Sequence, residues 1–167
     1  MDWVWAAIRW VHLVAAIAWI GGQLFLVLVL LPVLRRALPP AQRTLIVAQL
    51  GQRFAVVSWI SLGLLLVTGF LNGERRGVAW ESLPAAQSTY GQVLFAKLCL
   101  VAAVIALTLL HGQILGPRIT RLASVASIGG PDAETHRRRL ARLSIIVSGT
   151  NLLLNLAIVY LAARLVS

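Results

Sequence analysis

Four long apolar runs leave this 167-residue chain few ways to fold. They cover roughly residues 3–32, 46–71, 91–115 and 143–165, and each exceeds the length of about 18 residues that is typical of a membrane-spanning helix. Only 12% of the residues are charged, whereas soluble domains carry about 25%. The connections between the runs are short. We therefore predict an all-α integral membrane protein, with one domain over residues 1–167 folded as an up-down four-helix transmembrane bundle.

The basic residues are distributed unevenly among the connections. The segments 33–53 and 116–142 are rich in arginine, whereas the arginines in the connection 72–90 are balanced by Glu74 and Glu81. By the positive-inside rule, the two arginine-rich segments are cytoplasmic and both the N-terminus and the C-terminus lie outside. This topology, in a bacterial inner membrane, together with contact with anionic membrane lipid, accounts for the net charge of +10. Nucleic acid is not an expected partner.

Polar residues recur at helical spacing within each apolar run. The sets are Arg9, His12, Ala16, Trp19 and Gln23 in the first run; Ser58, Ser61 and Thr68 in the second; Lys97, Thr108 and His111 in the third; and Ser144, Ser148, Asn151 and Asn155 in the fourth. Lipid offers polar groups no partners, so each stripe is expected to face the interior of the bundle. Ordinary hydrogen bonding between helices explains the Ser, Thr and Asn positions, whereas the charged positions indicate a ligand.

Lys97 is the most informative of these residues. It is the one lysine of the chain, since the other fourteen basic residues are arginine, and it lies inside a predicted span. A lysine at the centre of a membrane helix costs ~2.5–3.5 kcal/mol on insertion scales. One explanation is that its long side chain reaches the outer interface, because Lys97 lies only ~10 Å from the outer end of its helix at ~1.5 Å per residue. The other is a functional role in the interior.

Counting helical rise places His12 and Lys97 nearly level, with Arg9 slightly closer to the outside. His111 lies ~21 Å deeper than Lys97 at the same rise per residue, so His12 and His111 are not expected to share one metal. All five acidic residues lie outside the predicted spans. Buried cations without carboxylate partners either lose their charge or find a counter-ion on a ligand. A haem would supply both an iron and acidic propionates.

Several of these residues resemble those of a known family. The first run contains His12, Trp19, Gly21, Gly22, Phe25, Pro32 and Arg35, in a pattern that resembles the first helix of the CopD-like superfamily. The third run, FAKLCLVAAVIALTLLHGQILGPR, is similar to the third helix of CopD domains and of HemJ-type protoporphyrinogen oxidases. "RF" at 53–54 and "TG" at 68–69 also resemble the second helix of CopD-type proteins.

The two branches of this superfamily imply different functions. A CopD-type protein implies copper uptake or resistance. A HemJ-type protein implies a four-helix haem-binding membrane protein in which a first-helix histidine and a third-helix lysine are essential. Those two residues correspond to His12 and Lys97.

The main hypothesis is a membrane protein that binds haem b and acts in electron transfer or oxidation. His12 would be the axial iron ligand, Lys97 a second ligand or an active-site base, Arg9 a propionate partner, and Trp19 part of the pocket wall. His111 is a further candidate for cofactor or metal binding, whereas His136, in "ETHRRR", is expected to be solvated. A second copy of the chain or a redox protein would be the partner.

Two alternatives remain. The first is a CopD-like protein that binds or transports copper, with His12, Lys97 and His111 as candidate ligands. Soft thiolate and thioether ligands suit Cu(I), and the chain has a single cysteine, Cys99, and a single methionine, the first residue. The second alternative is a non-enzymatic accessory subunit. In it, the polar stripes would serve assembly.

Overall fold

The computed structural model describes residues 2–118, 121 and 131–165, and all of its regular elements are helical. The first span is a continuous rod made of α1 (Asp2–Ala16), η1 (Ile17–Gly21), α2 (Gly22–Phe25), η2 (Leu26–Leu30) and α3 (Leu31–Ala37). It is followed by α4 (Pro40–Arg75), the short η3 (Trp80–Ala85), α5 (Thr89–Leu109) with its extension η4 (Leu110–Leu115), and α7 (Pro131–Arg164). The all-α membrane fold predicted from the sequence is confirmed.

Local sequence explains where the helices end. Leu38 adopts an extended conformation between α3 and α4, and Pro39 and Pro40 begin the next helix, where a missing N–H costs no hydrogen bond. Beyond α4, Gly77 has a φ of 68°, a conformation that favours glycine. The Ser88 hydroxyl then accepts a hydrogen bond from the Gly91 N–H and caps α5.

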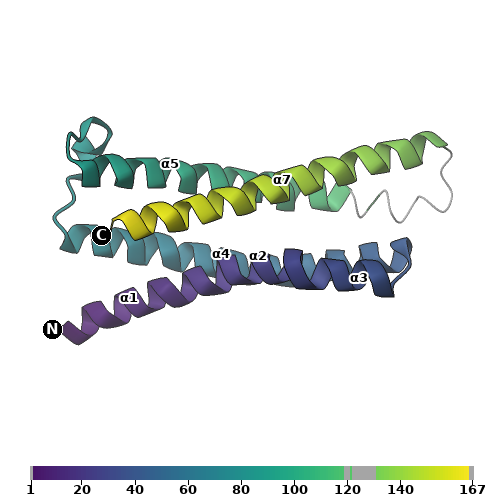
Figure 1. Cartoon of the computed structure of the whole chain (residues 1–167), viewed down its shortest axis with the longest axis horizontal. Coiled ribbons are helices and arrows are strands. Elements are labelled where there is room, and N and C mark those ends of the chain that lie inside the picture. Colours follow the sequence, from purple (N-terminus) through teal and green to yellow (C-terminus); the bar gives the residue numbers. More distant parts are fainter. Residues whose placement is uncertain (1, 119–120, 122–130, 166–167) are drawn as a thin grey trace.

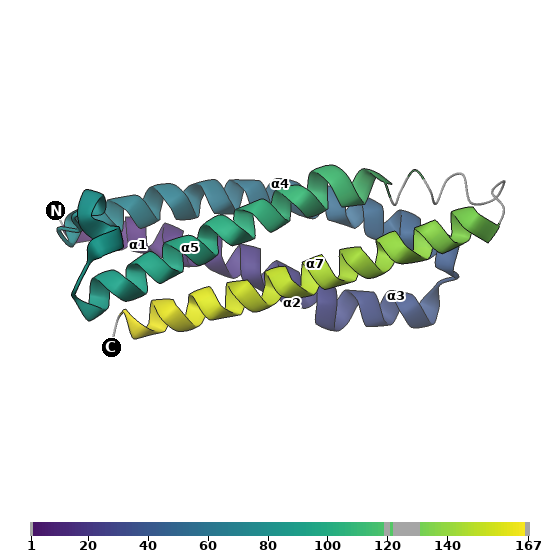
Figure 2. The same cartoon turned by 90° about the horizontal axis from the view of Figure 1, so that it is seen from above.

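Within the described part of the chain, four helices are long and apolar enough to cross a membrane: Asp2–Ala37, Gln42–Arg75, Thr89–Arg118 and Arg142–Arg164. They form two antiparallel hairpins, with α5 and α7 above the first span and α4 in Figure 1 and in front of them in Figure 2. In the first hairpin α1 packs on α4, and in the second α5 packs on α7. The two ends of the chain lie at one end of the bundle, which we call the outer end after the predicted topology, and the opposite end is the inner end. Which end faces out of the cell stays a prediction.

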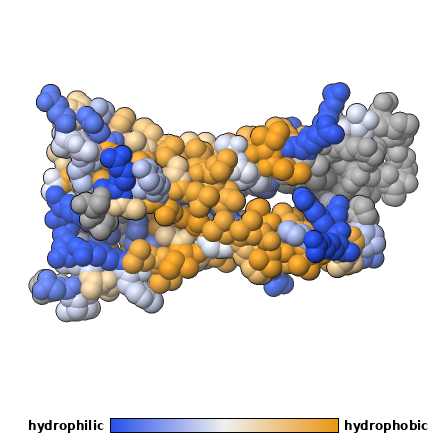
Figure 3. Space-filling view, viewed as in Figure 1, coloured by the Kyte–Doolittle hydropathy of each residue, from blue (hydrophilic) through white to orange (hydrophobic). Residues whose placement is uncertain are grey.

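On the face shown in Figure 3, the bundle is apolar around its middle and polar toward both ends. Many large apolar side chains are exposed there, among them Ile17, Leu28 and Leu153. The buried core is small. Its centre is a layer formed by Trp19, Leu62 and Val104, with Leu65, Ile105, Leu154 and Ile158 packed around them. We call these seven residues the apolar layer; they join the two hairpins at mid-height.

Aromatic and charged side chains close the outer end. The Arg75 guanidinium lies 5.0 Å from the Trp5 ring centre and 3.9 Å from an Asp2 carboxylate oxygen. Trp80, on the connection after α4, stacks on Phe70 with a centroid separation of 5.2 Å. The Trp80 stack fastens the connection 76–88 onto α4, and the Arg75 contacts join the outer ends of α4 and α1, as expected for aromatic residues at a membrane interface.

Candidate functional site

His12 is held by a short relay of hydrogen bonds between α1 and α4. Its Nδ1 lies 2.7 Å from the Thr68 hydroxyl oxygen, and that hydroxyl donates its hydrogen to the backbone carbonyl of Leu64. Thr68 is buried, and Gly69 beside it leaves room for the edge of the imidazole ring. A Cβ at Gly69 would lie 3.5 Å from His12 Cε1.

The relay determines which nitrogen of His12 carries the hydrogen. Because the only hydrogen of the Thr68 hydroxyl is used on Leu64, the oxygen must accept from His12, so Nδ1 is the donor. The neutral ring then keeps an unprotonated Nε2 with a free lone pair. Ligating histidines are commonly oriented in this way, by a hydrogen bond at the other nitrogen. The arrangement therefore prepares His12 Nε2 to bind a metal.

Lys97 lies at the same height as His12. His12 is seven residues before Trp19 and Lys97 is seven residues before Val104; both anchor residues belong to the apolar layer. Each side chain therefore lies ~10 Å beyond that layer toward the outer end, at ~1.5 Å per residue. The charge of Lys97 is close enough to interact with the His12 ring. The sequence count that levelled these two residues agrees with this geometry.

Arg76 adds a second cation to this region. It follows α4, and its charge interacts with that of Lys97. Its guanidinium also donates a hydrogen bond of 3.3 Å to the Tyr90 hydroxyl. Nearby carboxylates have other partners, since Glu74 accepts a hydrogen bond from the Trp80 indole and Asp2 lies against Arg75. The outer site, which we define as His12, Thr68, Lys97 and Arg76, is thus rich in positive charge.

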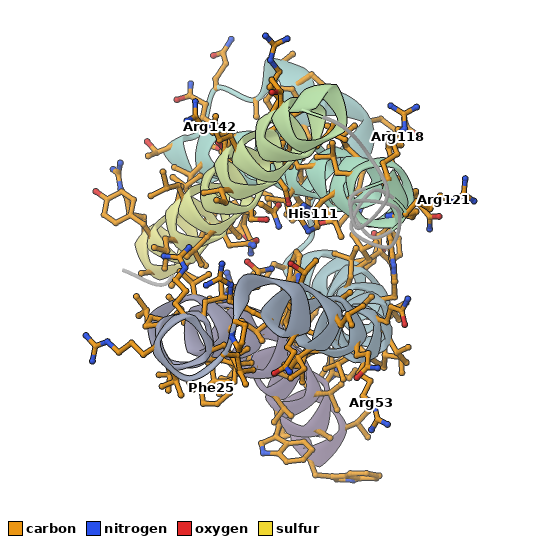
Figure 4. The ribbon with its side chains drawn as sticks, turned by 90° about the vertical axis from the view of Figure 1, so that its right-hand side faces the viewer. Phe25, Arg53, His111, Arg118, Arg121 and Arg142 are labelled. Carbon is orange, nitrogen blue, oxygen red and sulfur yellow. The ribbon has the colours of Figure 1, made fainter. Side chains whose placement is uncertain are left out.

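The other candidate residues from the sequence lie apart from the outer site. Arg9 is exposed. Trp19 is 3% exposed and packs in the apolar layer, about two turns from His12. His111 is on η4, on the inner side of that layer, and lies between the two hairpins (Figure 4). The labelled residues Phe25, Arg53, Arg118, Arg121 and Arg142 lie around the periphery in the same view. The His136 side chain is outside the described part of the chain.

The polar stripes of the spans face inward. Ser58, Ser61, Thr68 and Asn155 are all buried. Asn155 Nδ2 donates a hydrogen bond of 3.0 Å to Gln23 Oε1 and links α7 to α2, and the Ser148 hydroxyl lies 3.4 Å from His111 Nδ1.

The donor set limits which metals these sites could hold. Among the described residues, no group of three or more His, Cys, Asp or Glu side chains could surround a metal ion. The one thiol, Cys99, is exposed on the surface of α5. A metal at the outer site would therefore be held mainly through nitrogen donors, His12 Nε2 and a deprotonated Lys97, with few ligands in total. Such a set suits a weakly held, exchangeable ion better than a permanent closed centre.

Sequence reasoning missed two parts of this arrangement. Thr68 was predicted as a member of the polar stripe and of the "TG" pair at 68–69, but not as the hydrogen-bond partner of His12. Arg76 lies beyond the end of its span, and nothing in the sequence indicates that its charge acts on Lys97. Both depend on which helix faces meet.

Comparison with known proteins assigns the chain to a family. The family model for copper resistance protein D matches residues 48–165, which include Lys97 and His111 but not His12. A protein of Aquifex aeolicus (strain VF5), described as uncharacterized, is 30% identical over 155 residues, which are 92% of this chain and 90% of that protein. No solved structure gives a significant match. The family match favours the copper hypothesis, and no comparison supports the haem hypothesis. The chain is a multi-pass membrane protein that belongs to the CopD, or copper resistance protein D, family.

Proposed function

We propose that this protein binds copper inside the bacterial inner membrane, in copper uptake or resistance, and that His12 Nε2 is the first ligand. The single observation that carries the proposal is the relay from His12 Nδ1 through Thr68 to the Leu64 carbonyl. It leaves Nε2 unprotonated and fixes the plane of the ring. Family membership supports the choice of metal, since the matching model describes copper resistance.

Copper also agrees with the available donors. Copper binds N, O and S sites more tightly than the other divalent first-row metals, so a site with few ligands still favours it. The second donor in this proposal is the amine of Lys97, which must first release its proton, because a protonated lysine repels the metal. Copper is then cargo: it binds at the outer site, is held by two nitrogen donors, and leaves readily because nothing encloses it.

The test is metal analysis of the purified full-length protein. Wild type is expected to bind copper in equilibrium dialysis against a copper-supplemented buffer, and His12→Ala is expected to bind less of it. His136→Ala serves as the matched control, because it removes a histidine from the arginine-rich segment 116–142, which is not part of the outer site. Equal copper binding in the two variants would remove His12 from the site.

A second candidate function, haem binding, is favoured by the charge of the outer site. Arg76 and Lys97 interact as two cations, and the carboxylates of Asp2 and Glu74 have other partners. An anionic ligand would compensate this charge. Haem b would offer its propionates to these cations, with His12 Nε2 as axial ligand and Lys97 as second ligand or base, and would supply one-electron redox chemistry when bound.

One absorption spectrum separates the two functions. Protein expressed with added haem and read before and after dithionite would give a Soret band and sharpened reduced α and β bands if it binds haem b. Stoichiometric copper without a Soret band supports the copper proposal. Neither signal would favour the accessory-subunit hypothesis, in which the outer site only helps assembly with a partner protein.

A further inference from the structure

A second group of polar side chains lies on the inner side of the apolar layer. His111 Nδ1 is 3.4 Å from the Ser148 hydroxyl, which sets α5 with η4 against α7 at this height. The two helices are antiparallel, so moving one turn toward the outer end reaches Thr108 on α5 and Asn151 on α7. Thr108, His111, Ser148 and Asn151 are therefore neighbours. We call these four residues the inner site.

Buried oxygen atoms in and beside the inner site lack hydrogen-bond partners. Among the described residues they are Thr108 Oγ1, Asn151 Oδ1 and Asn155 Oδ1. Asn155 is 1% exposed and lies one turn from Asn151, and its Nδ2 is already used on Gln23. Buried polar atoms in native proteins are nearly always satisfied, and in a membrane the cost of leaving them unpaired is high.

The chemistry of these atoms indicates what is missing. All three are oxygens with free lone pairs, which a hydrogen-bond donor or a cation would satisfy; the Thr108 hydroxyl can also donate. His111 adds a ring nitrogen that is not used on Ser148. A mixed set of imidazole nitrogen and amide or hydroxyl oxygen is the donor set that suits divalent copper. The five residues Thr108, His111, Ser148, Asn151 and Asn155 all lie within the segment that matches the copper resistance family.

We propose that Thr108, His111 and Asn151 form a second binding site for Cu²⁺, on the inner side of the apolar layer. The inference deepens the proposed function and depends on it: the outer site receives the ion and the inner site releases it toward the arginine-rich end. Asn155 offers its unpartnered oxygen between the two. Trp19, Leu62 and Val104 lie between the outer site and the inner site, so a single copper ion cannot be bound by both sites at once.

The experiment measures how many copper ions the full-length protein binds in lipid nanodiscs. CuCl2 is titrated by equilibrium dialysis, and the bound metal is examined by electron paramagnetic resonance. Wild type is expected to bind two ions. His111→Gln and Asn151→Leu are each expected to bind one, and His111→Gln also loses nitrogen hyperfine splitting from the inner ion. Gln113→Leu, which changes an exposed residue of η4, is the matched control and keeps both ions.

Other outcomes separate failure of this inference from failure of the proposed function. A single wild-type ion that is lost in His12→Gln and kept in His111→Gln would overturn the inner site alone, and water would then fill it. Two wild-type ions that both persist in His12→Gln, with one lost in His111→Gln, would support the inner site and overturn the assignment of His12. No copper in wild type would overturn both. Asn151→Leu removes an unpaired buried oxygen, so this variant should melt at or above the melting temperature of wild type. Such a result shows that the loss of a bound copper ion in this variant is not caused by unfolding.

Discussion

The hydroxyl of Thr68 can be removed almost without changing its shape, and this tests the relay directly. In Thr68→Val a methyl group replaces the oxygen that accepts the His12 N–H and donates to the Leu64 carbonyl. Leu64 lies within α4, where backbone N–H groups satisfy carbonyls, so it loses little. His12 loses its one identified partner. The ring is then free to turn and to move its hydrogen to Nε2, where it blocks the metal.

The size of the effect follows from these two losses. A hydrogen bond between membrane helices contributes ~0.6–1.7 kcal/mol, and an N–H left unpaired in the interior costs ~1–3 kcal/mol. Loss of a residue that orients a ligating histidine typically weakens metal binding ~10–100-fold, or ~1.4–2.8 kcal/mol at 1.4 kcal/mol per tenfold. We therefore expect Thr68→Val to weaken copper binding at the outer site ~10–100-fold by these figures.

Competition with a chelator of known copper affinity, on protein in detergent, measures the change. Thr68→Ser keeps the hydroxyl and should bind copper like wild type. Thr150→Val makes the same chemical change at an exposed position of α7 and should also have no effect. If Thr68→Val and Thr150→Val bind copper equally well, the relay does not prepare His12 and the reasoning fails.

Three further predictions concern packing, charge and topology. Gly22→Ala places a methyl group 2.3 Å from the Phe54 ring and should destabilise the protein by ~1–3 kcal/mol in thermal unfolding, whereas Gly21→Ala, with nothing within 4 Å, should not. Lys97→Met removes a cation that costs ~2.5–3.5 kcal/mol in a membrane, so the variant protein should insert normally. It should nevertheless bind copper ~10-fold more weakly than wild type. An unchanged copper affinity would indicate that the Lys97 side chain only reaches toward the interface. Gln87→Cys, in a cysteine-free background, should react with an impermeant thiol reagent added to intact cells, and labelling only after lysis would reverse the predicted topology.

Hydropathy alone predicted the fold well, because a membrane restricts what an apolar run can become. The four predicted runs coincide closely with the spans of the structure, and the difference lies mainly at their ends, where polar turns extend the helices beyond the lipid. α4, for example, begins at Pro40 and continues to Arg75. Helical rise was also enough to bring His12 and Lys97 to one height, since a rise per residue needs no knowledge of packing.

Which residues form hydrogen bonds between helices was harder to predict than the fold, for a physical reason. A polar stripe shows which face of a helix avoids lipid, but not which residue of another helix it meets. Gln23 and Asn155 are 132 positions apart, and their hydrogen bond depends on how the two hairpins are joined. Arg9 belongs to the predicted stripe and is nevertheless exposed, because it lies toward the outer end of α1, away from the apolar layer.

The first span contains two wider, π-helical stretches, Ile17–Gly21 and Leu26–Leu30, between α-helical segments. In such a stretch the hydrogen bonds run from residue i to i+5, so each accommodates a residue that an α-helix would not. Removing one residue there restores an α-helical turn and leaves the flanking segments facing as before, whereas the same deletion between His12 and Ala16 would rotate His12 relative to Trp19. Single-residue differences in length between related proteins should therefore fall within these two stretches, and a sequence alignment that instead places such a gap before His12 would pair His12 with the wrong residue.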